Sequence, residues 1–148
     1  MTLALHPIDE RVSVSGQLDP EDMKEIAAAG YATVVNNRPD GEAMYGQPAT
    51  AALRQAAEAA GLVFLDLPFS GPQATPAQVR ALADVLATGD GKIAAFCKSG
   101  MRSTLLWGAA SLANGRPLEE VLNGARRAGH NLDPAADLMA SLATQARR

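Results

Sequence analysis

The chain has 148 residues, of which 47% are hydrophobic and 20% are charged, a balance typical of a globular protein with a buried core. Its net charge of -3 at pH 7 gives no general attraction to nucleic acid or to acidic membranes. No apolar run approaches the roughly 18 residues of a membrane helix, and the N-terminal stretch lacks the pattern of a secretory signal. A single cysteine excludes an internal disulfide, so we expect a cytoplasmic protein in which residues 1–148 form one domain.

Strand and helix patterns alternate from the N-terminus onward. Residues 11–16 alternate in polarity like a strand, and we predict that Asp19 caps the helix that follows and that Gly30 ends it. The β-branched residues 31–37 predict a buried strand. The alanine-rich residues 50–60 predict a second helix.

The same alternation continues in the second half of the chain. Residues 62–69 predict a third strand, and Thr75 with the proline after it predicts the start of a helix that runs to about residue 88. Residues 92–97 predict a fourth strand. Further helical patterns lie at residues 102–112, after Pro117, and from Asp133 to the C-terminus. This order predicts a layered α/β fold with a mainly parallel sheet of about four to five strands.

The only cysteine, Cys97, lies where the fourth predicted strand ends and a helix begins. Ligands of parallel sheets bind at this edge. A lone cysteine is otherwise most often a small buried hydrophobe, so the prediction depends on the residues that follow it. Gly100 permits a tight turn, and backbone N–H groups at a helix N-terminus can converge on an anion or a thiolate. Arg102 adds a planar charge suited to oxyanions, and the Ser103 hydroxyl can donate a hydrogen bond to the sulfur.

This combination predicts a nucleophilic site around the cysteine. The candidate catalytic residues are Cys97, Arg102 and Ser103. The rest of the loop is predicted to bind the substrate through Lys98, Ser99, Gly100 and Met101.

The pattern Cys-x-x-Gly-x-Arg-Ser resembles the cysteine loops of rhodanese-type sulfurtransferases and of protein tyrosine phosphatases. Together with the segments VSGQLDPEDM and VVNNRPDGE, it more closely resembles the phosphatase-like domain of bacterial beta-lactamase-hydrolase-like (Blh) proteins and a stand-alone sulfurtransferase-like family. The resemblance covers about residues 12–113. It implies a three-layer, tyrosine-phosphatase-like fold in which helices flank a central sheet.

Three sequence features separate sulfur transfer from phosphoryl transfer. Four residues lie between Cys97 and Arg102, whereas tyrosine phosphatases have five, and the shorter loop resembles that of rhodaneses, which hold a persulfide. Phosphatases of this type also protonate the leaving group with an aspartate from a neighbouring loop, but residues 68–75 contain no carboxylate. Phe96 stands where these families usually have a histidine. These departures favour sulfur transfer.

The segment after the second predicted strand contributes further candidates. Asp40 and Glu42 either approach the site or serve as a turn aspartate and a solvated glutamate. Arg38 either braces this loop or contacts a substrate anion, and Arg38 and Asp40 are included as candidate substrate-binding residues. His6 and His130 lie far apart in the sequence without metal-ligand spacing, so no metal site is predicted, and no cofactor is implied.

The sequence therefore predicts a cysteine-dependent sulfurtransferase. Cys97 would take sulfane sulfur from a small anionic donor, such as thiosulfate or a persulfide. It would pass the sulfur to cyanide or to an external thiol such as glutathione or a protein thiol, since no second cysteine can resolve the persulfide. The alternatives are a tyrosine-phosphatase-like phosphatase that acts on a phosphoester through a phospho-cysteine, and a non-catalytic anion-binding or redox-sensing module. Neither nucleic acid nor a membrane is a predicted partner.

Overall fold

A five-stranded sheet forms the centre of the protein. The computed structural model describes residues 3–148, and its strands lie in the order β1-β2-β5-β3-β4. The last four strands of this order are parallel to one another, whereas β1 pairs with β2 in the antiparallel sense. The strands are β1 (His6–Pro7), β2 (Val12–Ser15), β3 (Tyr31–Asn36), β4 (Val63–Asp66) and β5 (Lys92–Phe96). The predicted α/β fold with a mainly parallel sheet is confirmed.

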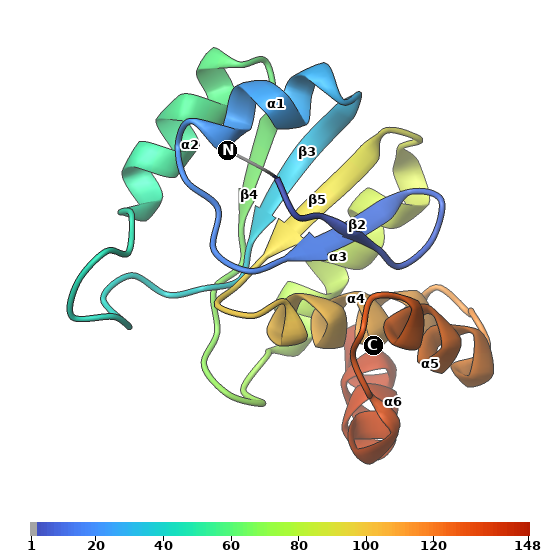
Figure 1. The fold of residues 1–148 in the computed structure, drawn as a ribbon. Helices are drawn as coiled ribbons and strands as arrows, with labels where there is room; N and C mark the ends of the chain where they lie inside the picture. The colour runs from blue at the N-terminus through green and yellow to red at the C-terminus, as the bar shows by residue number, and fades with distance from the viewer. Residues whose placement is uncertain (1–2) are drawn as a thin grey trace.

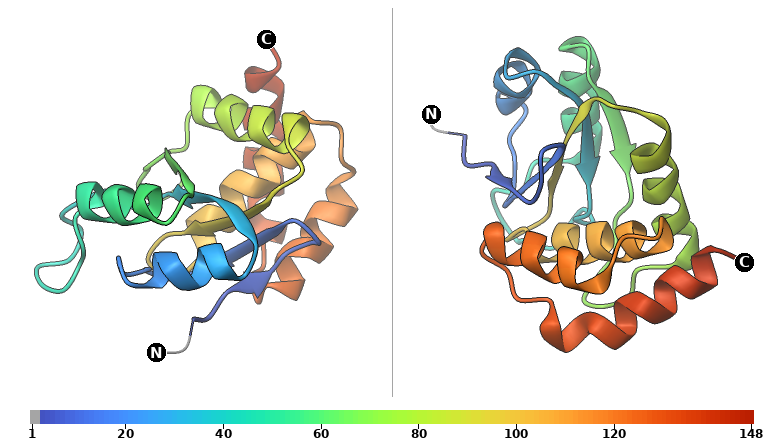
Figure 2. Two further views of the ribbon diagram at one scale, coloured as in Figure 1. Left: turned by 90° about the horizontal axis from the view of Figure 1, so that it is seen from above. Right: turned by 90° about the vertical axis from the view of Figure 1, so that its right-hand side faces the viewer.

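Helices cover both faces of this sheet, which gives a three-layer arrangement (Figure 1). The helical elements are α1 (Asp22–Ala28), α2 (Thr50–Ala59), α3 (Pro76–Thr88), α4 (Met101–Ala113), α5 (Leu118–Arg127), the 3₁₀ turn η1 (Asp133–Ala135) and α6 (Ala136–Ala146). Helices α1 and α2 lie on one face, α3 and α4 lie on the other, and α5 and α6 pack against α4 (Figure 2). Within residues 3–148, no helix is both long enough and apolar enough to cross a membrane.

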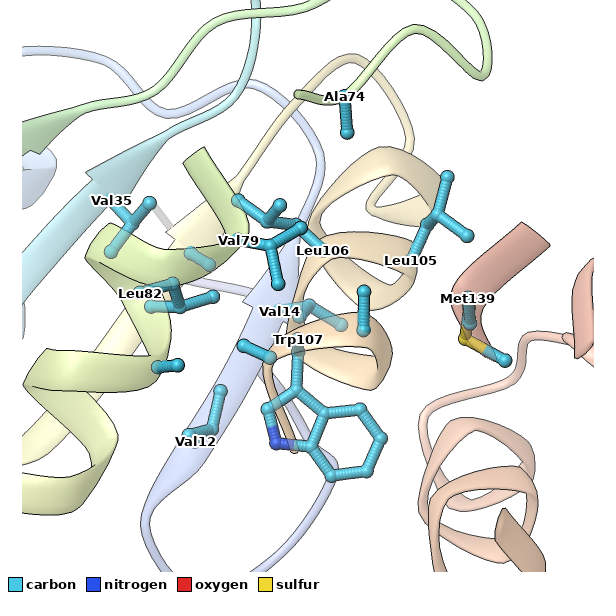
Figure 3. Close-up of a cluster of buried hydrophobic side chains, with 14 of the residues drawn as sticks. Val12, Val14, Val35, Ala74, Val79, Leu82, Leu105, Leu106, Trp107 and Met139 are labelled. Carbon is cyan, nitrogen blue, oxygen red and sulfur yellow. The ribbon is translucent and has the colours of Figure 1, made fainter. Parts of the chain in front are cut away.

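The core consists of two apolar clusters, one on each face of the sheet. Neighbouring residues of a strand point to opposite faces, so Val34 belongs to the cluster under α1 and α2, whereas Val35 belongs to the cluster under α3 and α4. In the second cluster, Trp107 of α4 lies beside Val12 and Val14 of β2 (Figure 3). Trp107 is 1% exposed, which confirms its predicted place in the core.

Most of the predicted helix ends are confirmed, but one is wrong. Thr75 caps α3, since its side chain accepts a hydrogen bond from Gln78 N and the reciprocal bond is also present. Gly30 follows α1 with φ +94°, a conformation that favours glycine. Asp19 does not cap α1, because residues 19–22 form a backbone turn and the helix begins at Asp22. The side chain of Asp22 accepts a hydrogen bond from Asp19 N at 2.7 Å instead.

Candidate active site

The cysteine loop begins directly after β5, at the carboxyl edge of the parallel sheet. Its first residue, Cys97, is 1% exposed, and its N–H donates to Ser15 O of the neighbouring strand segment at 3.3 Å. The loop then passes closely over Gly16, where a Cβ atom would lie 2.9 Å from Lys98 O. It ends at Gly100, whose φ of +98° allows the chain to turn into α4. The sheet edge thus fixes the sulfur at the N-terminus of a helix.

Backbone N–H groups surround the sulfur of Cys97. The N–H of Gly100 donates to Sγ at 3.0 Å. Burial alone raises the pKa of the Cys97 thiol, but hydrogen bonds from the N–H groups of Ser103, Ser99, Gly100 and Arg102 outweigh burial, so the pKa lies below its ordinary value. The loop therefore stabilises a thiolate, which is the nucleophilic form of cysteine.

Arg102 forms a two-pronged ion pair with Glu42. Arg102 Nη1 donates to Glu42 Oε2 at 2.8 Å, and Nη2 donates to Oε1 at 2.9 Å. Nη1 also donates to Phe69 O at 3.0 Å, which ties the guanidinium to the loop after β4. The hydrogen bond from Arg102 lowers the pKa of Glu42, and the same pair raises the pKa of Arg102. Both groups are therefore charged at neutral pH, and the ion pair engages both terminal nitrogens of Arg102.

Arg38 supports the same carboxylate from a second direction. Arg38 Nε donates to Glu42 Oε1 at 3.0 Å, and Arg38 Nη1 donates to Gln17 Oε1 at 2.9 Å. Asn36, two residues earlier, holds the backbone of Arg38: its Oδ1 accepts from Arg38 N at 2.9 Å, and its Nδ2 donates to Arg38 O at 3.0 Å. The same Nδ2 also donates to Asp66 Oδ1 at 2.8 Å. Arg38 therefore braces the loop, and its side chain also lines the cavity beside the cysteine loop.

The other predicted site residues have distinct environments. Both Thr50 N and Thr50 Oγ1 donate to Asp40 Oδ1 at 2.8 Å, so this carboxylate holds the start of α2, and it does not line the cavity. The predicted bond from the Ser103 hydroxyl to the sulfur is wrong, since the buried Oγ has no hydrogen-bond partner within residues 3–148. Ser103 contributes its backbone N–H to the sulfur instead. Lys98 and Met101 are exposed and line the cavity. Three predicted substrate-binding residues therefore do not line the cavity: Asp40, which holds α2, and Ser99 and Gly100, whose N–H groups face the Cys97 sulfur.

A cavity of about 850 Å³ opens beside the cysteine loop. Its charged lining residues are Arg38, Glu42, Lys98 and Arg102. Its other walls come from the loops around Ala43 and Gly71 and from a segment near the C-terminus, and they are mostly apolar. The sequence analysis did not identify the residues of that last segment, Asn131, Leu132, Pro134, Ala135 and Leu138, or Leu105 of α4 as lining residues.

Sequence reasoning also did not place His130 at the cysteine loop. A Cβ atom on Gly100 would lie 3.0 Å from His130 Nε2, so the imidazole packs against this glycine. Burial chiefly lowers the pKa of His130, and the neighbouring His6 lowers it further. Across residues 3–148 there is no group of three or more histidine, cysteine, aspartate or glutamate side chains placed to hold a metal ion.

A parallel sheet with a cysteine-arginine loop between β5 and α4 defines a protein of the tyrosine-phosphatase-like fold class. Tk-PTP in its active form has this fold, with a TM-score of 0.70 over 99% of this chain and 98% of that chain at 19% identity. A candidate phosphatase from Neisseria meningitidis Z2491 superposes with a TM-score of 0.78 over 95% of this chain and 99% of that chain, at 30% identity.

The chain belongs to the family of the phosphatase-like domain of beta-lactamase hydrolase-like proteins, whose sequence model matches residues 4–115. The beta-lactamase hydrolase-like protein of Agrobacterium fabrum is 37% identical over 109 residues, and that of Xylella fastidiosa Temecula1 is 36% identical over 109 residues. Each match covers 74% of this chain but 25% of the relative, so the chain spans about a quarter of the length of these relatives. The resemblance to this family in the sequence analysis is confirmed.

Proposed function

We propose that the chain is a cysteine-dependent phosphatase in which Cys97 is the nucleophile. The observation that carries the proposal is the ring of N–H groups around the Cys97 sulfur, next to the guanidinium of Arg102. The family and the fold neighbours support phosphoryl transfer over the sulfur transfer that the sequence analysis put first. Phosphoryl transfer therefore replaces sulfur transfer as the first candidate function.

The chemistry would take place in two displacements at phosphorus. The Cys97 thiolate attacks the phosphorus of a bound monoester, an S–P bond forms, and the P–O bond to the leaving group breaks with its electron pair on oxygen. Water then attacks the phospho-cysteine, the S–P bond breaks, and the thiolate and inorganic phosphate are released. The N–H groups of the loop and Arg102 would hold the phosphoryl oxygens in both steps.

The range of leaving groups follows from the carboxylates near the site. Residues 68–75 carry no acid, and the pKa of Glu42 is lowered chiefly by its hydrogen bond from Arg102, so Glu42 is ionised in the free protein. A proton is therefore not at hand for a poor leaving group. We expect the fastest turnover with phosphate esters whose leaving group is a stable anion, such as aryl phosphates.

Sulfur transfer is the second candidate, and the same missing acid favours it. The thiolate would attack the outer sulfur of thiosulfate, the S–S bond would break, and sulfite would leave with the electron pair without needing a proton. Cyanide, or an external thiol such as glutathione or a protein thiol, would then remove the outer sulfur from the Cys97 persulfide. The loop with four residues between Cys97 and Arg102 also favours this reading. Both reactions need a reduced Cys97, so we place the activity in a reducing compartment such as the cytoplasm.

A side-by-side assay with an aryl phosphate and with thiosulfate plus cyanide, normalised to titrated thiol, separates these functions. We expect phosphate release that Cys97→Ser abolishes and that Arg102→Lys lowers by about 10²- to 10³-fold in kcat/KM, because lysine cannot form the two-pronged contact. Arg80→Lys on α3, away from the cavity, is the control and should keep full activity. Thiosulfate turnover without phosphate release would replace this proposal with sulfur transfer. Anion binding without either turnover would leave an anion-binding or redox-sensing module.

A further inference from the structure

The cavity beside the cysteine loop has a charged part and an apolar part that come from different segments. The charged side chains gather at the loop, where Glu42 binds both Arg38 and Arg102. The apolar part comes mainly from residues that follow α5, including Leu132 and Leu138. These lie beyond residues 4–115, which match the family model.

Helix α4 connects the two parts. Its first turn carries Met101 and Arg102, and Leu105 lies three to four residues further along the same face. All three residues line the cavity, so this face of α4 runs from the cysteine loop to the apolar wall. A ligand with its anionic group at Arg102 would therefore lie along an apolar surface.

The remaining apolar lining residues come from three other segments. Pro72 lies in the loop after β4, Ala43 lies next to Glu42, and Pro134 and Ala135 lie in η1. A volume of about 850 Å³ falls in the range of small-molecule sites, which are mostly apolar with a few polar groups that fix the ligand. A bare phosphate or thiosulfate ion would leave most of this volume unused.

We propose that the substrate is a small molecule with an anionic head and an apolar alkyl or aryl body, and that Leu105, Leu132 and Leu138 select it by contact with that body. The anionic head would bind at the cysteine loop and the body would lie against the apolar wall. This inference rests on the proposed function of the loop as an anion-binding active site.

Binding of n-alkylphosphonates to the reduced protein, measured by calorimetry, tests the inference without requiring turnover. Methyl-, butyl- and hexylphosphonate share one head group and differ only in apolar length. We expect the affinity to rise with length, up to about fourfold for each methylene that is fully buried. Hexylamine, which has the same chain and a cationic head, should not compete with hexylphosphonate.

Two variants of the wall locate the bound chain. Leu138→Ser removes apolar surface from the wall, and Ala135→Trp fills space in it, so each should reduce the ratio of hexyl- to methylphosphonate affinity by about fivefold or more. Leu122→Ser is the matched control, since Leu122 is also a half-buried leucine packed against the same core cluster but does not line the cavity. It should leave the ratio unchanged. Thermal unfolding confirms that each variant is folded, and Ala135→Trp retains the test if Leu138→Ser does not fold.

The outcomes separate the inference from the proposed function. If methylphosphonate binds and length adds nothing, or if the wall variants leave the ratio unchanged, the apolar-body inference is wrong while the anion site stands. If a phosphotyrosyl peptide competes far better than hexylphosphonate, the small-molecule assignment is wrong. If no phosphonate binds, the proposed function fails together with the inference.

Discussion

At the scale of single residues, the charge state of Cys97 decides whether the site can react. Burial disfavours the thiolate, but four backbone N–H groups favour it more strongly, so the pKa is lowered. We expect the rate of alkylation by iodoacetamide to rise with pH to a plateau with a midpoint below the ~8.5 of a free cysteine. Reactivity should fall as the pH drops through that midpoint, because the thiolate is then protonated. A midpoint at or above ~8.5 would show that burial prevails.

The ionised side chain of Glu42 makes the stability of the folded protein depend on pH in the acid range. Its pKa is lowered mainly by Arg102 and then by Arg38, so its ionised form is favoured in the folded state. Its contribution to the free energy of unfolding is therefore complete above the unfolded-state pKa of about 4.3 and is lost as the pH falls through the lower folded-state value. We expect Glu42→Gln to reduce the loss of stability between pH 5 and pH 3, measured by urea unfolding, by a small amount because the pair is partly exposed.

The matched control for that measurement is Glu58→Gln, since Glu58 lies on α2 and makes no ion pair within residues 3–148. This control should retain the pH dependence of the original protein. An unchanged slope in Glu42→Gln would indicate that the ion pair with Arg102 does not persist in solution.

Gly100 is required by two separate constraints. Its φ of +98° is unfavourable for residues with a Cβ atom, and that Cβ would lie 3.0 Å from His130 Nε2. We expect Gly100→Ala to destabilise the protein by more than 1 kcal/mol, the rough scale of the backbone effect alone. Gly115→Ala is the control, because Gly115 has φ +92° and nothing within 4 Å of its Cβ position. Equal losses in the two variants, measured by thermal unfolding, would exclude a role for the His130 contact.

At the scale of secondary-structure elements, the start of α3 depends on a capping box formed by two side chains. Thr75 and Gln78 form reciprocal capping bonds at 3.1 and 3.0 Å. Loss of the cap in Thr75→Ala should cost about 1 kcal/mol and lower Tm by about 2–4 °C. Thr88→Ala, at the exposed C-terminal end of the same helix, should have a smaller effect. A fall in Tm for Thr88→Ala as large as that for Thr75→Ala would show that the capping box is not the cause.

The sequence correctly predicted those helix ends that depend on only a few neighbouring residues. The proline after Thr75 and the glycine after α1 mark helix ends through backbone geometry that depends on few neighbours. The two-residue strand β1 was not predicted, because so short a segment has no period and exists only through pairing with β2. The prediction for Asp19 failed because a backbone turn competes with the cap at that position.

The residues of the candidate site also differ in whether the sequence alone predicts their role. Cys97, Gly100 and Arg102 are predictable because one short loop carries all of them. The role of Glu42 remained open between two readings, since its contact with Arg102 joins residues that are 60 positions apart. The apolar wall near Leu138 has no local signal, because an apolar residue on a helix is most often part of the core.

At the scale of the whole molecule, the sheet places the anion-binding loop on one edge, and segments from both halves of the chain surround it. The segment after β3 supplies Arg38 and Glu42, β5 and α4 supply the nucleophile and Arg102, and the region around η1 supplies the apolar wall. The phosphatase-like fold therefore accounts for the loop. The C-terminal helices account for the shape of the cavity beside it.

The most direct test of the central claim is rapid acid quenching of the reaction with an aryl phosphate, followed by mass spectrometry of the peptide that contains Cys97. We predict a phosphate-sized adduct on Cys97 that forms within the first turnover, decays as the substrate is consumed, and does not form in Cys97→Ser. Turnover of the ester without any adduct on Cys97, or an adduct on another residue, would contradict the assignment of Cys97 as the nucleophile.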